Sequence, residues 1–424
     1  MKICIFEDDK YKLLYPLSLT RPVFDLKCGY FTLRERISGN FSEDICYLLR
    51  DYLVPFAQKK LPKAVFNDPD FLKSDDILFI NGRWLLGKGE LCLEGEEEVG
   101  VYNDTILYVR TKKETIQSHF SSQFKFKTLL FSLNQIEQKL PHKEFNNVTL
   151  ITYPWDLVNN NSKILCEDFE YTGKKGIQGS FSPQAAIYGD ESKIFIAKSA
   201  QIHPFVVLDT TEGPIYIDEE AVIYPHTRIE GPSYIGKATH IFQANIKQGV
   251  SLGPICRVGG EVEESIIHGF SNKFHTGFLG HSYVGEWVNL GAMSTTSDIK
   301  NDFSSVQVYI EGELRDSKQI KVGSFIGDHS KIGIGCLLNT GTVVGVGAIV
   351  VPSGEVLPKF IPSFVWYLKG KFYKGYGFGK IIEGTKEQMK RRNMEMSEEE
   401  YELLREVFEL TKEERNQLIA KSRR

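Results

Sequence analysis

Apolar residues recur at every sixth position across much of 196–350, and this period constrains the fold more than any other feature of the chain. The clearest run is unbroken, with a small side chain two places before each member: Ile326, Ile332, Leu338, Val344 and Val350. A helix repeats every 3.6 residues and a strand every two, so neither explains the spacing. A six-residue period is typical of a hexapeptide β-helix, in which three short faces close a triangular coil. About 20 hexads predict a left-handed parallel β-helix over 187–355, with roughly six or seven coils.

Two interruptions of the hexads predict loops that leave the coil. A short one covers 210–214, and a longer polar one covers 297–321. Aliphatic side chains fill the interior of such a coil, so ligands are expected on its outer faces or between neighbouring coils. Flat faces that stack favour a homotrimer. The longer loop is therefore a candidate wall of a site shared with a neighbouring subunit.

Composition excludes several classes of function. Apolar residues make up 42% of the chain and charged residues 25%, as in ordinary globular proteins. A net charge of −4 gives no electrostatic reason to expect nucleic acid or a membrane as a partner. The seven cysteines form no CxxC pair, which indicates thiols in a reducing compartment. With no apolar run close to membrane-spanning length, we expect a cytoplasmic location.

The regions before and after the hexads have different patterns. Residues 1–180 mix short apolar strands at 3–6, 77–80 and 148–152 with polar loops, and Pro154 opens a helix. This order predicts an α/β layer with ligands at the carboxyl ends of its strands. Residues 356–424 are expected to form a C-terminal extension with helices that pack back on the body.

Several ordered segments resemble one known family. They are LLYPLSLTRPVFDLKCGYFTLRE, INGRW, YPWDLV, VVLDTTEGPIYI, SNKFHTGFLGHSYVGEWVNLGA, NTGTVVG and PKFIPSFVW. The chain resembles the bifunctional N-acetylglucosamine-1-phosphate uridyltransferase/glucosamine-1-phosphate acetyltransferase family, in its divergent bacterial branch. The resemblance implies a nucleotidyltransferase-like α/β domain at 1–180 and an acyltransferase-like β-helix at 187–355. It also implies nucleotide and sugar 1-phosphate substrates, Mg²⁺, and acetyl-CoA as co-substrate.

The same resemblance implies roles for residues of the β-helix. His275 lies where the family has its acetyltransferase histidine, and a neutral imidazole can accept the proton of an attacking amine. Asn289 matches a position that contacts the sugar. Lys273 and Lys300 are expected to bind its phosphate as point charges, and Arg257 is a further anion partner.

Three positions depart from the better-known branch of the family. Phe278 stands where that branch has Tyr, Glu263 replaces a lysine that binds the sugar phosphate, and Met293 replaces a Gly. Two neighbouring carboxylates, Glu263 and Glu264, would repel a phosphate. These departures leave open which acceptor the β-helix uses.

In the first domain, the usual Gly-rich phosphate loop is missing, because no Gly occurs before Lys27. Arg21 is expected to grip phosphate as a bidentate fork, and Lys27 to bind the attacking sugar phosphate. Polar residues after the predicted strands complete the expected nucleotide site: Asp8, Asn81 and Arg83. Because Asn81 stands at the usual place of the metal aspartate, the candidate Mg²⁺ ligands are Asp8, Asp9, Asp104 and Asp156, of which we expect Asp8 and Asp156.

Two alternatives remain open. The missing Gly-rich loop and the departures in the β-helix also fit a non-catalytic, trimeric sugar-nucleotide-binding regulator. The second alternative is a zinc carbonic-anhydrase-like β-helix, in which histidines about two coils apart converge. His275 follows His240 by 35 positions, and His281 follows His275 by 6, which is close to such a spacing. Three imidazoles with an open position would suit catalytic zinc.

Overall fold

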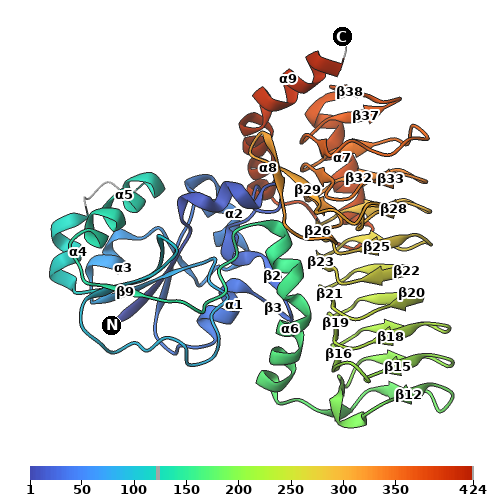
Figure 1. Cartoon of the computed structure of the whole chain (residues 1–424), viewed down its shortest axis with the longest axis horizontal. Coiled ribbons are helices and arrows are strands. Elements are labelled where there is room, and N and C mark those ends of the chain that lie inside the picture. The colour runs from blue at the N-terminus through green and yellow to red at the C-terminus, as the bar shows by residue number, and fades with distance from the viewer. Residues whose placement is uncertain (121–124, 423–424) are drawn as a thin grey trace.

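The computed structural model describes residues 1–120 and 125–422. Figure 1 shows three parts: an α/β domain, a tall stack of parallel strands beside it, and helices at the C-terminal end of that stack. The predicted α/β domain, parallel β-helix and helical C-terminal part are therefore confirmed. No helix in the described ranges is long and apolar enough to cross a membrane.

The first domain is built on one seven-stranded mixed sheet with β1 near its centre. β1 runs parallel to β4 and β6, whereas β8 pairs with β6 in the antiparallel direction. In sheet order the strands are β5 (Val65–Phe66), β4 (Ile45–Leu48), β1 (Lys2–Phe6), β6 (Ile77–Asn81), β8 (Thr105–Thr111), β7 (Glu98–Tyr102) and β9 (His142–Glu144). The carboxyl ends of β1, β4 and β6 thus meet at one edge, where a ligand is expected.

Helices and a small hairpin surround this sheet. The helices are α1 (Leu33–Ser38), α2 (Val54–Lys60), α3 (Pro69–Lys73), α4 (Lys113–His119), α5 (Phe126–Glu137) and α6 (Pro154–Thr172). The hairpin consists of β2 (Lys27–Cys28) and β3 (Phe31–Thr32). Helix α6 begins at Pro154 as predicted, and it runs between the first domain and the coil (Figure 1).

The β-helix has three faces, each a ladder of short parallel strands. Face one holds ten strands: β10 (Gly176–Ile177), β13 (Ile194–Ile196), β16 (Ile215–Ile217), β19 (Ser233–Ile235), β21 (Val250–Leu252), β23 (Ile266–Gly269), β26 (Tyr283–Glu286), β31 (Phe325–Ile326), β34 (Val343–Val344) and β36 (Phe360–Ile361). This exceeds the six or seven coils predicted, because strands at both ends lie outside the clean hexads. The coil begins at Gly176, ahead of the predicted 187, and continues past 355.

The other two faces share two long strands that turn a corner, β20 (His240–Ile246) and β22 (Arg257–Glu263). Face two also contains β11 (Ser180–Phe181), β14 (Gln201–Ile202), β17 (Val222–Ile223), β24 (Asn272–Lys273), β27 (Asn289–Leu290), β32 (Lys331–Ile332), β35 (Ile349–Val350) and β37 (Trp366–Leu368). Face three adds β12 (Ala186–Tyr188), β15 (Val207–Asp209), β18 (Arg228–Glu230), β25 (Phe278–Gly280), β28 (Thr295–Thr296) and β33 (Leu337–Leu338). Buried Ile, Val and Leu side chains from all three faces fill one continuous core.

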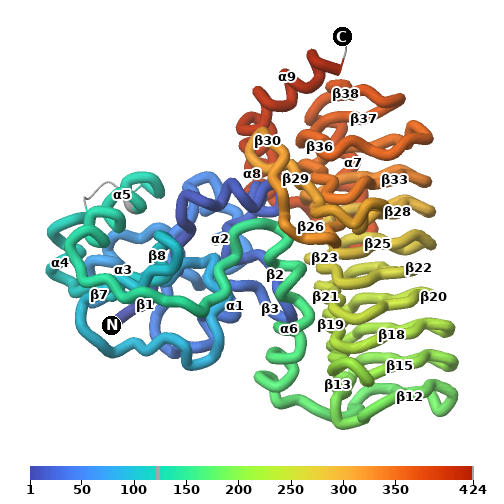
Figure 2. The backbone as a smooth tube through the Cα atoms, viewed as in Figure 1, coloured from blue at the N-terminus to red at the C-terminus, as the bar shows by residue number. Residues whose placement is uncertain are grey.

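The two predicted interruptions are present. Residues 210–214 form a bend between β15 and β16, and 297–321 hold the antiparallel hairpin β29 (Gln307–Ile310) and β30 (Glu313–Asp316). Figure 2 shows this hairpin near the tail helices and facing the first domain. The hairpin therefore lies at the meeting point of all three parts of the chain.

The C-terminal part packs back on the body, as predicted. A short strand, β38 (Lys371–Tyr373), pairs antiparallel with β37, and three helices follow: α7 (Gly377–Lys390), α8 (Glu398–Leu410) and α9 (Lys412–Ser422). Leu403, Leu404 and Val407 of α8 are buried in a core that also contains residues of the first domain. The tail thus joins the first domain to the end of the coil.

Candidate functional site

At the carboxyl edge of the central sheet, a buried ion pair joins Glu7 and Arg50. Glu7 follows β1 and is fully buried, and its Oε1 lies 3.0 Å from Nη2 of Arg50. Arg50 follows β4 and also donates to the backbone oxygens of Ser18 and Arg21 at 2.6 and 2.9 Å. This pair fixes the loops that surround the predicted nucleotide site.

Asp8, Asn81 and Arg83, all expected in that site, bind one another. Arg83 is fully buried and forms an ion pair with Asp8, and its Nη1 also donates to the oxygen of Ile151 at 2.7 Å. The Asn81 amide donates to Asp8 Oδ2 at 3.0 Å. The structure therefore brings the three residues together, with their polar atoms committed to protein partners.

Arg21 and Lys27 face the β-helix. Arg21 donates to Asp328 Oδ2 at 2.6 Å and lies 3.3 Å from Glu286 Oε2. Burial acts to lower the pKa of Arg21, but these two carboxylates raise it above its ordinary value. The Lys27 ammonium donates to the oxygen of Tyr30, and burial lowers its pKa. Arg21 lines a cavity of about 310 Å³, whereas Lys27 is enclosed.

Asp156 caps the N-terminus of α6. Its Oδ2 accepts hydrogen bonds from the backbone N–H groups of Thr152 and Tyr153, both at 2.8 Å. Burial raises the pKa of Asp156 despite these bonds. Its role as a metal ligand, like that of Asp8, stays an untested prediction.

A cavity beside this edge, lined by described residues, has a volume of about 1170 Å³. Its wall on the first domain is basic and aromatic, and the side chains include Tyr11, Lys12, Lys125, Phe126 and Lys127. The opposite wall comes from hairpin β29–β30, the end of the coil and α9, and it carries acidic side chains: Glu311, Glu413 and Glu414. The loop at 297–321, predicted as a site wall, thus lines a cavity within its own chain.

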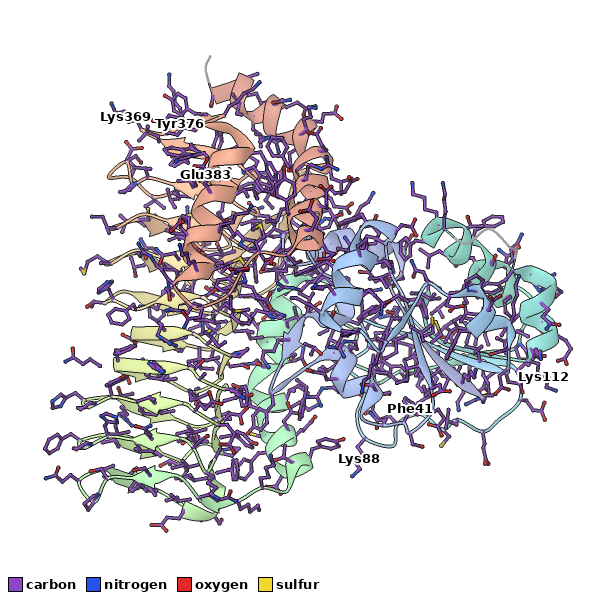
Figure 3. All side chains as sticks on the ribbon, turned by 180° about the vertical axis from the view of Figure 1, so that it is seen from behind. Phe41, Lys88, Lys112, Lys369, Tyr376 and Glu383 are labelled. Atoms are coloured by element: carbon purple, nitrogen blue, oxygen red, sulfur yellow. The ribbon has the colours of Figure 1, made fainter. Side chains whose placement is uncertain are left out.

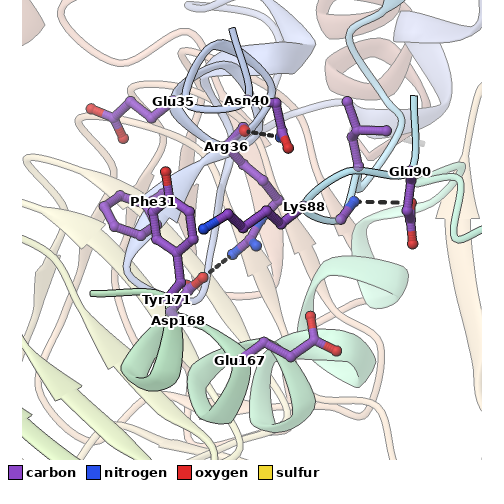
Figure 4. A pocket seen from close by; sticks show the side chains of 11 residues that line it. Phe31, Glu35, Arg36, Asn40, Lys88, Glu90, Glu167, Asp168 and Tyr171 are labelled. Carbon is purple, nitrogen blue, oxygen red and sulfur yellow. Dashed lines mark hydrogen bonds and ion pairs between the residues drawn. The ribbon is translucent and has the colours of Figure 1, made fainter. Parts of the chain in front are cut away.

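A second cavity of about 520 Å³ lies between α1 and α6. Figure 4 shows Lys88 pointing across it toward Tyr171, and the Lys88 Nζ lies 5.4 Å from the ring centroid. Figure 3 shows Lys88 at the surface of the first domain, on the side that faces the coil. Four carboxylates line this cavity: Glu35, Glu90, Glu167 and Asp168. Because these negative charges repel phosphate, this second cavity is a poorer site for a nucleoside triphosphate than the cavity lined by Lys12, Lys125 and Lys127.

On the β-helix, His275 is exposed at a corner of the coil. Among the described aromatic residues, only Phe274 has a ring in contact with that of His275, and the two ring centroids are 4.9 Å apart. Lys273, two positions earlier, pairs in register with the inward-facing Val258 and is buried. Its ammonium donates to the oxygens of Gly259, His275 and Gly277 at 2.8, 3.0 and 2.6 Å. This placement does not support the prediction that Lys273 binds a substrate phosphate.

The other predicted substrate residues lie on two separate surfaces. Asn289 and Arg257 are half-buried on the outer side of face two, each in register with Asn272. Lys300 lies in the 297–321 loop, where its ammonium donates to the Ser304 hydroxyl and to the Ser305 oxygen. Asn289 and Arg257 are thus two coils apart on one surface, and Lys300 belongs to another.

Comparison with known proteins assigns the first domain. Residues 3–175 match the model of a family described as sugar nucleotidyl transferase. The N-terminal domain is a sugar nucleotidyl transferase domain. Its match ends immediately before β10, the first strand of the coil.

Similar curated proteins are bifunctional. One from Sulfurisphaera tokodaii, a bifunctional sugar-1-phosphate nucleotidylyltransferase/acetyltransferase, is 33% identical over 28% of this chain and 30% of its own length. The bifunctional protein GlmU of Shouchella clausii is 25% identical over 40% of each chain. The chain is a distant relative of these proteins, and the matches span less than half of their lengths.

Solved structures of acyltransferases also align with this chain. The Francisella novicida UDP-N-acetylglucosamine acyltransferase covers 56% of this chain and 87% of its own, at 16% identity and a TM-score of 0.32. A putative acetyltransferase from Bacillus cereus covers 53% of this chain, at 17% identity and a TM-score of 0.23.

The zinc alternative requires several metal-binding side chains at one place. The described residues contain no group of three or more His, Cys, Asp or Glu side chains that could hold a metal ion. His281 is paired with Asp298, whose Oδ2 lies 2.8 Å from Nδ1. Burial, Arg257 and Arg392 lower the pKa of His240 to about 4. Two guanidinium charges beside His240 oppose cation binding there.

Sequence reasoning missed the three lysines of the large cavity beside the sugar nucleotidyl transferase sheet. Lys12 follows β1 within the 3-10 helix Asp9–Leu14, so its position after a central strand was an available signal. Lys125 and Lys127 lie at the start of α5, more than 100 positions away, and only the fold brings them to the same cavity.

Proposed function

We propose that this chain makes a nucleotide sugar. The first domain transfers a nucleotidyl group from a nucleoside triphosphate to a sugar 1-phosphate. The β-helix transfers an acetyl group from acetyl-CoA to the amine of an amino-sugar phosphate. The observation that carries the first half is the lysine-lined cavity beside the carboxyl ends of β1 and β4, in a domain that matches sugar nucleotidyl transferases.

The charges of this cavity suit a polyphosphate. Lys12, Lys125 and Lys127 are exposed, and none forms an ion pair with another described residue. Their charges are therefore available to a ligand. Each charge-assisted hydrogen bond to phosphate contributes about 1.5–3 kcal/mol. The acidic wall opposite repels polyphosphate, so phosphates are directed toward the lysines.

The aromatic side chains of the same wall suit a nucleobase. Tyr11 lies 6.0 Å from Tyr15 and 6.1 Å from Phe126 between ring centroids, and all three rings line the cavity. A base can stack on such rings without base-specific hydrogen bonds. This arrangement supports nucleotide binding and leaves the identity of the base open.

Nucleotidyl transfer then requires in-line attack. An oxygen of the sugar 1-phosphate forms a bond to the α-phosphorus, the bond to the bridging oxygen breaks, and pyrophosphate leaves. Mg²⁺ supplies charge neutralisation at the phosphates. Among the described residues lining the cavity, Asp51 is the carboxylate that the first domain contributes. It is exposed, directly follows Arg50, and its Oδ1 accepts a hydrogen bond from the backbone N–H of Phe126 at 3.2 Å. Since Mg²⁺ commonly uses one or two carboxylates together with substrate phosphates, we propose Asp51 as its protein ligand.

For acyl transfer, we propose His275 as the general base. Its imidazole is exposed at a corner of the coil, where a substrate can reach it. A neutral ring nitrogen of His275 accepts a proton from the amine while the amine nitrogen forms a bond to the thioester carbonyl carbon. The carbon–sulfur bond then breaks, and the leaving sulfur takes up this proton, so that coenzyme A departs as its thiol. A base of this kind contributes about 10²–10⁴-fold to the rate. A homotrimer assembled through the β-helix, in the cytoplasm, belongs to the same proposal.

Nucleotide binding tests the proposed cavity. Isothermal titration of the full chain with nucleoside triphosphates and Mg²⁺ is compared among wild type, Lys12→Ala, Lys127→Ala and Lys59→Ala. Lys59 is exposed on α2 outside the cavity and serves as the matched control. We expect about 10-fold weaker binding or more for each cavity variant and no change for the control. Equal affinities in all four proteins would contradict the proposal.

One observation favours a second function, the non-catalytic regulator. Asp8, Arg21, Lys27, Asn81 and Arg83 all make close contacts with protein groups. A regulator would bind the same nucleotides in the same cavity without releasing pyrophosphate. Pyrophosphate release with a panel of sugar 1-phosphates therefore separates the enzyme from the regulator.

A further inference from the structure

A column of polar side chains runs along the outer side of face two. Its members share one register position on successive coils: His240, Arg257, Asn272, Asn289 and Lys331. The residues that follow several of them face the aliphatic core, so strand alternation directs the column outward. It therefore presents donors and cations to whatever lies over this face.

The tail crosses this column and adds a second arginine to it. Lys331 donates from Nζ to the Gln388 side chain of α7, which anchors that helix to the coil. Figure 3 shows Glu383 of α7 where the helix lies against the stack of strands. In the turn that follows α7, Arg392 donates from Nη2 to Asn272 Oδ1 at 2.6 Å.

The guanidinium groups of Arg257 and Arg392 form no ion pair with a carboxylate in the described part of the chain. Arg257 donates from Nη1 to the oxygens of Ala238 and Cys256 at 3.0 and 2.9 Å. Burial and the charge of Arg392 lower the pKa of Arg257, and burial lowers that of Arg392. Arg257 pairs in register with Asn272, which accepts the hydrogen bond from Arg392, so two half-buried cations of like charge lie close together with no carboxylate partner among the described residues.

Aromatic rings lie on the same face beside His240, the neighbour of Arg257 in the register of the coil. Phe242 stacks on Tyr224 with centroids 4.5 Å apart, and Phe274 lies 4.4 Å from Phe242. Phe274 in turn contacts His275, the proposed base. A flat group placed on these rings would hold an attached anion near the arginines.

We propose that Arg257 and Arg392, with Asn272 positioning Arg392, bind a phosphate-class oxyanion of a substrate of the β-helix. The phosphate belongs either to the nucleotide part of the acyl donor or to the sugar phosphate that accepts the acyl group. The second arginine comes from the tail, so the tail completes this site. The inference rests on the proposed acyl transfer for its ligand and is independent of nucleotidyl transfer.

Sulfate is the probe, because its charge does not change near neutral pH. Binding of sulfate to the full chain is measured by isothermal titration for wild type, Arg257→Gln, Arg392→Gln and the double variant. Arg405→Gln is the control, since Arg405 is exposed and paired with Glu402. We expect about 10-fold weaker binding for each single variant and none detectable at this site for the double variant. Unchanged sulfate binding in the double variant would overturn the proposal.

Competition identifies the source of the phosphate. Displacement of sulfate by adenosine 3′,5′-bisphosphate, and not by glucosamine 1-phosphate, assigns the site to the acyl donor, and the reverse assigns it to the acceptor. Failure of both compounds to displace sulfate would overturn the assignment to a substrate phosphate. Sulfate binding is measured without turnover, so it tests the anion site separately from acetyl transfer. A β-helix that binds sulfate but has no acetyltransferase activity contradicts the proposed acyl transfer, whereas an active β-helix that binds no sulfate contradicts the anion site.

Discussion

Arg21 of the first domain donates a hydrogen bond to Asp328 of the β-helix across 2.6 Å, although the two residues are 307 positions apart in the sequence. Both side chains are almost fully buried, at 6% and 5% exposure. Asp328 also accepts from the Thr20 hydroxyl at 2.5 Å and from the backbone N–H of Glu286 at 2.7 Å. This junction fixes the first domain against face one of the coil.

Breaking this pair is expected to loosen the junction. Arg21→Met leaves Asp328 buried without its cation, and removal of one partner of a buried pair costs about 3–5 kcal/mol. We expect a clearly lower urea midpoint for Arg21→Met, with partial recovery in Arg21→Met/Asp328→Asn. Arg405→Met, at an exposed pair, serves as the control and should change little. Equal midpoints for Arg21→Met and the control would contradict this role.

Glu400 of α8 makes stability depend on pH. Burial raises its pKa to about 7, and the nearby carboxylates Glu286 and Asp328 act in the same direction. The folded state therefore holds a proton that the unfolded state releases above its pKa of about 4.3, so stability falls as pH rises from there toward 7. At pH 8 we expect Glu400→Gln to be more stable than wild type by roughly 3 kcal/mol, from about 1.4 kcal/mol per pKa unit.

The pH dependence of Glu400→Gln identifies the cause. The advantage should vanish near pH 4, where the carboxyl group is protonated in both states. Glu398→Gln, an exposed position in the first turn of α8, is the matched control and should match wild type throughout. Urea unfolding between pH 4 and 8 measures the effect, and a constant difference between Glu400→Gln and wild type would rule out titration.

Lys273 is expected to hold the corner that carries His275. Lys273→Met keeps an unbranched side chain but removes the ammonium group that donates to three backbone oxygens, among them that of His275. Loss of such bonds costs about 1–3 kcal/mol each where the oxygen stays buried. We expect faster hydrogen exchange at 274–277 in this variant. Lys237→Met, at an exposed ion pair on the coil, should leave that exchange unchanged.

Acetyl transfer should depend on His275. His275→Ala is expected to lower acetyl-CoA-dependent activity by about 10²–10⁴-fold and to leave pyrophosphate release unchanged. His203→Ala is the control, since His203 lies on the coil beside Tyr224. Acetyl transfer that survives in His275→Ala would show that another group accepts the proton.

The β-helix was predictable from the sequence where aliphatic residues recur at the same position of successive hexads. The hexads at Ile326 and Val350 predict the coil because most interior positions hold aliphatic side chains, which pack without hydrogen bonds. The end strands at Gly176 and Phe360 could not be placed, since they lie outside clean hexads. Strand pairing at the ends depends on backbone geometry that single residues do not reveal.

The sites were less predictable, because long-range partners decide what a charged side chain does. Lys273 is a charged residue at an interior position, and its three backbone acceptors exist only once the corner is formed. Arg21 lies in a motif that suggests phosphate binding, yet its partner is Asp328 in another domain. Lys12 and Lys127 meet at one cavity only through the fold.

The most direct test is the detection of the product. The full chain is incubated with a nucleoside triphosphate panel, sugar 1-phosphates and Mg²⁺, and mass spectrometry follows the formation of a nucleotide sugar. The account predicts such a product together with pyrophosphate, and at least 10-fold less of both with Lys12→Ala/Lys127→Ala. Nucleotide binding in the cavity without any nucleotide-sugar product across the panel would contradict it.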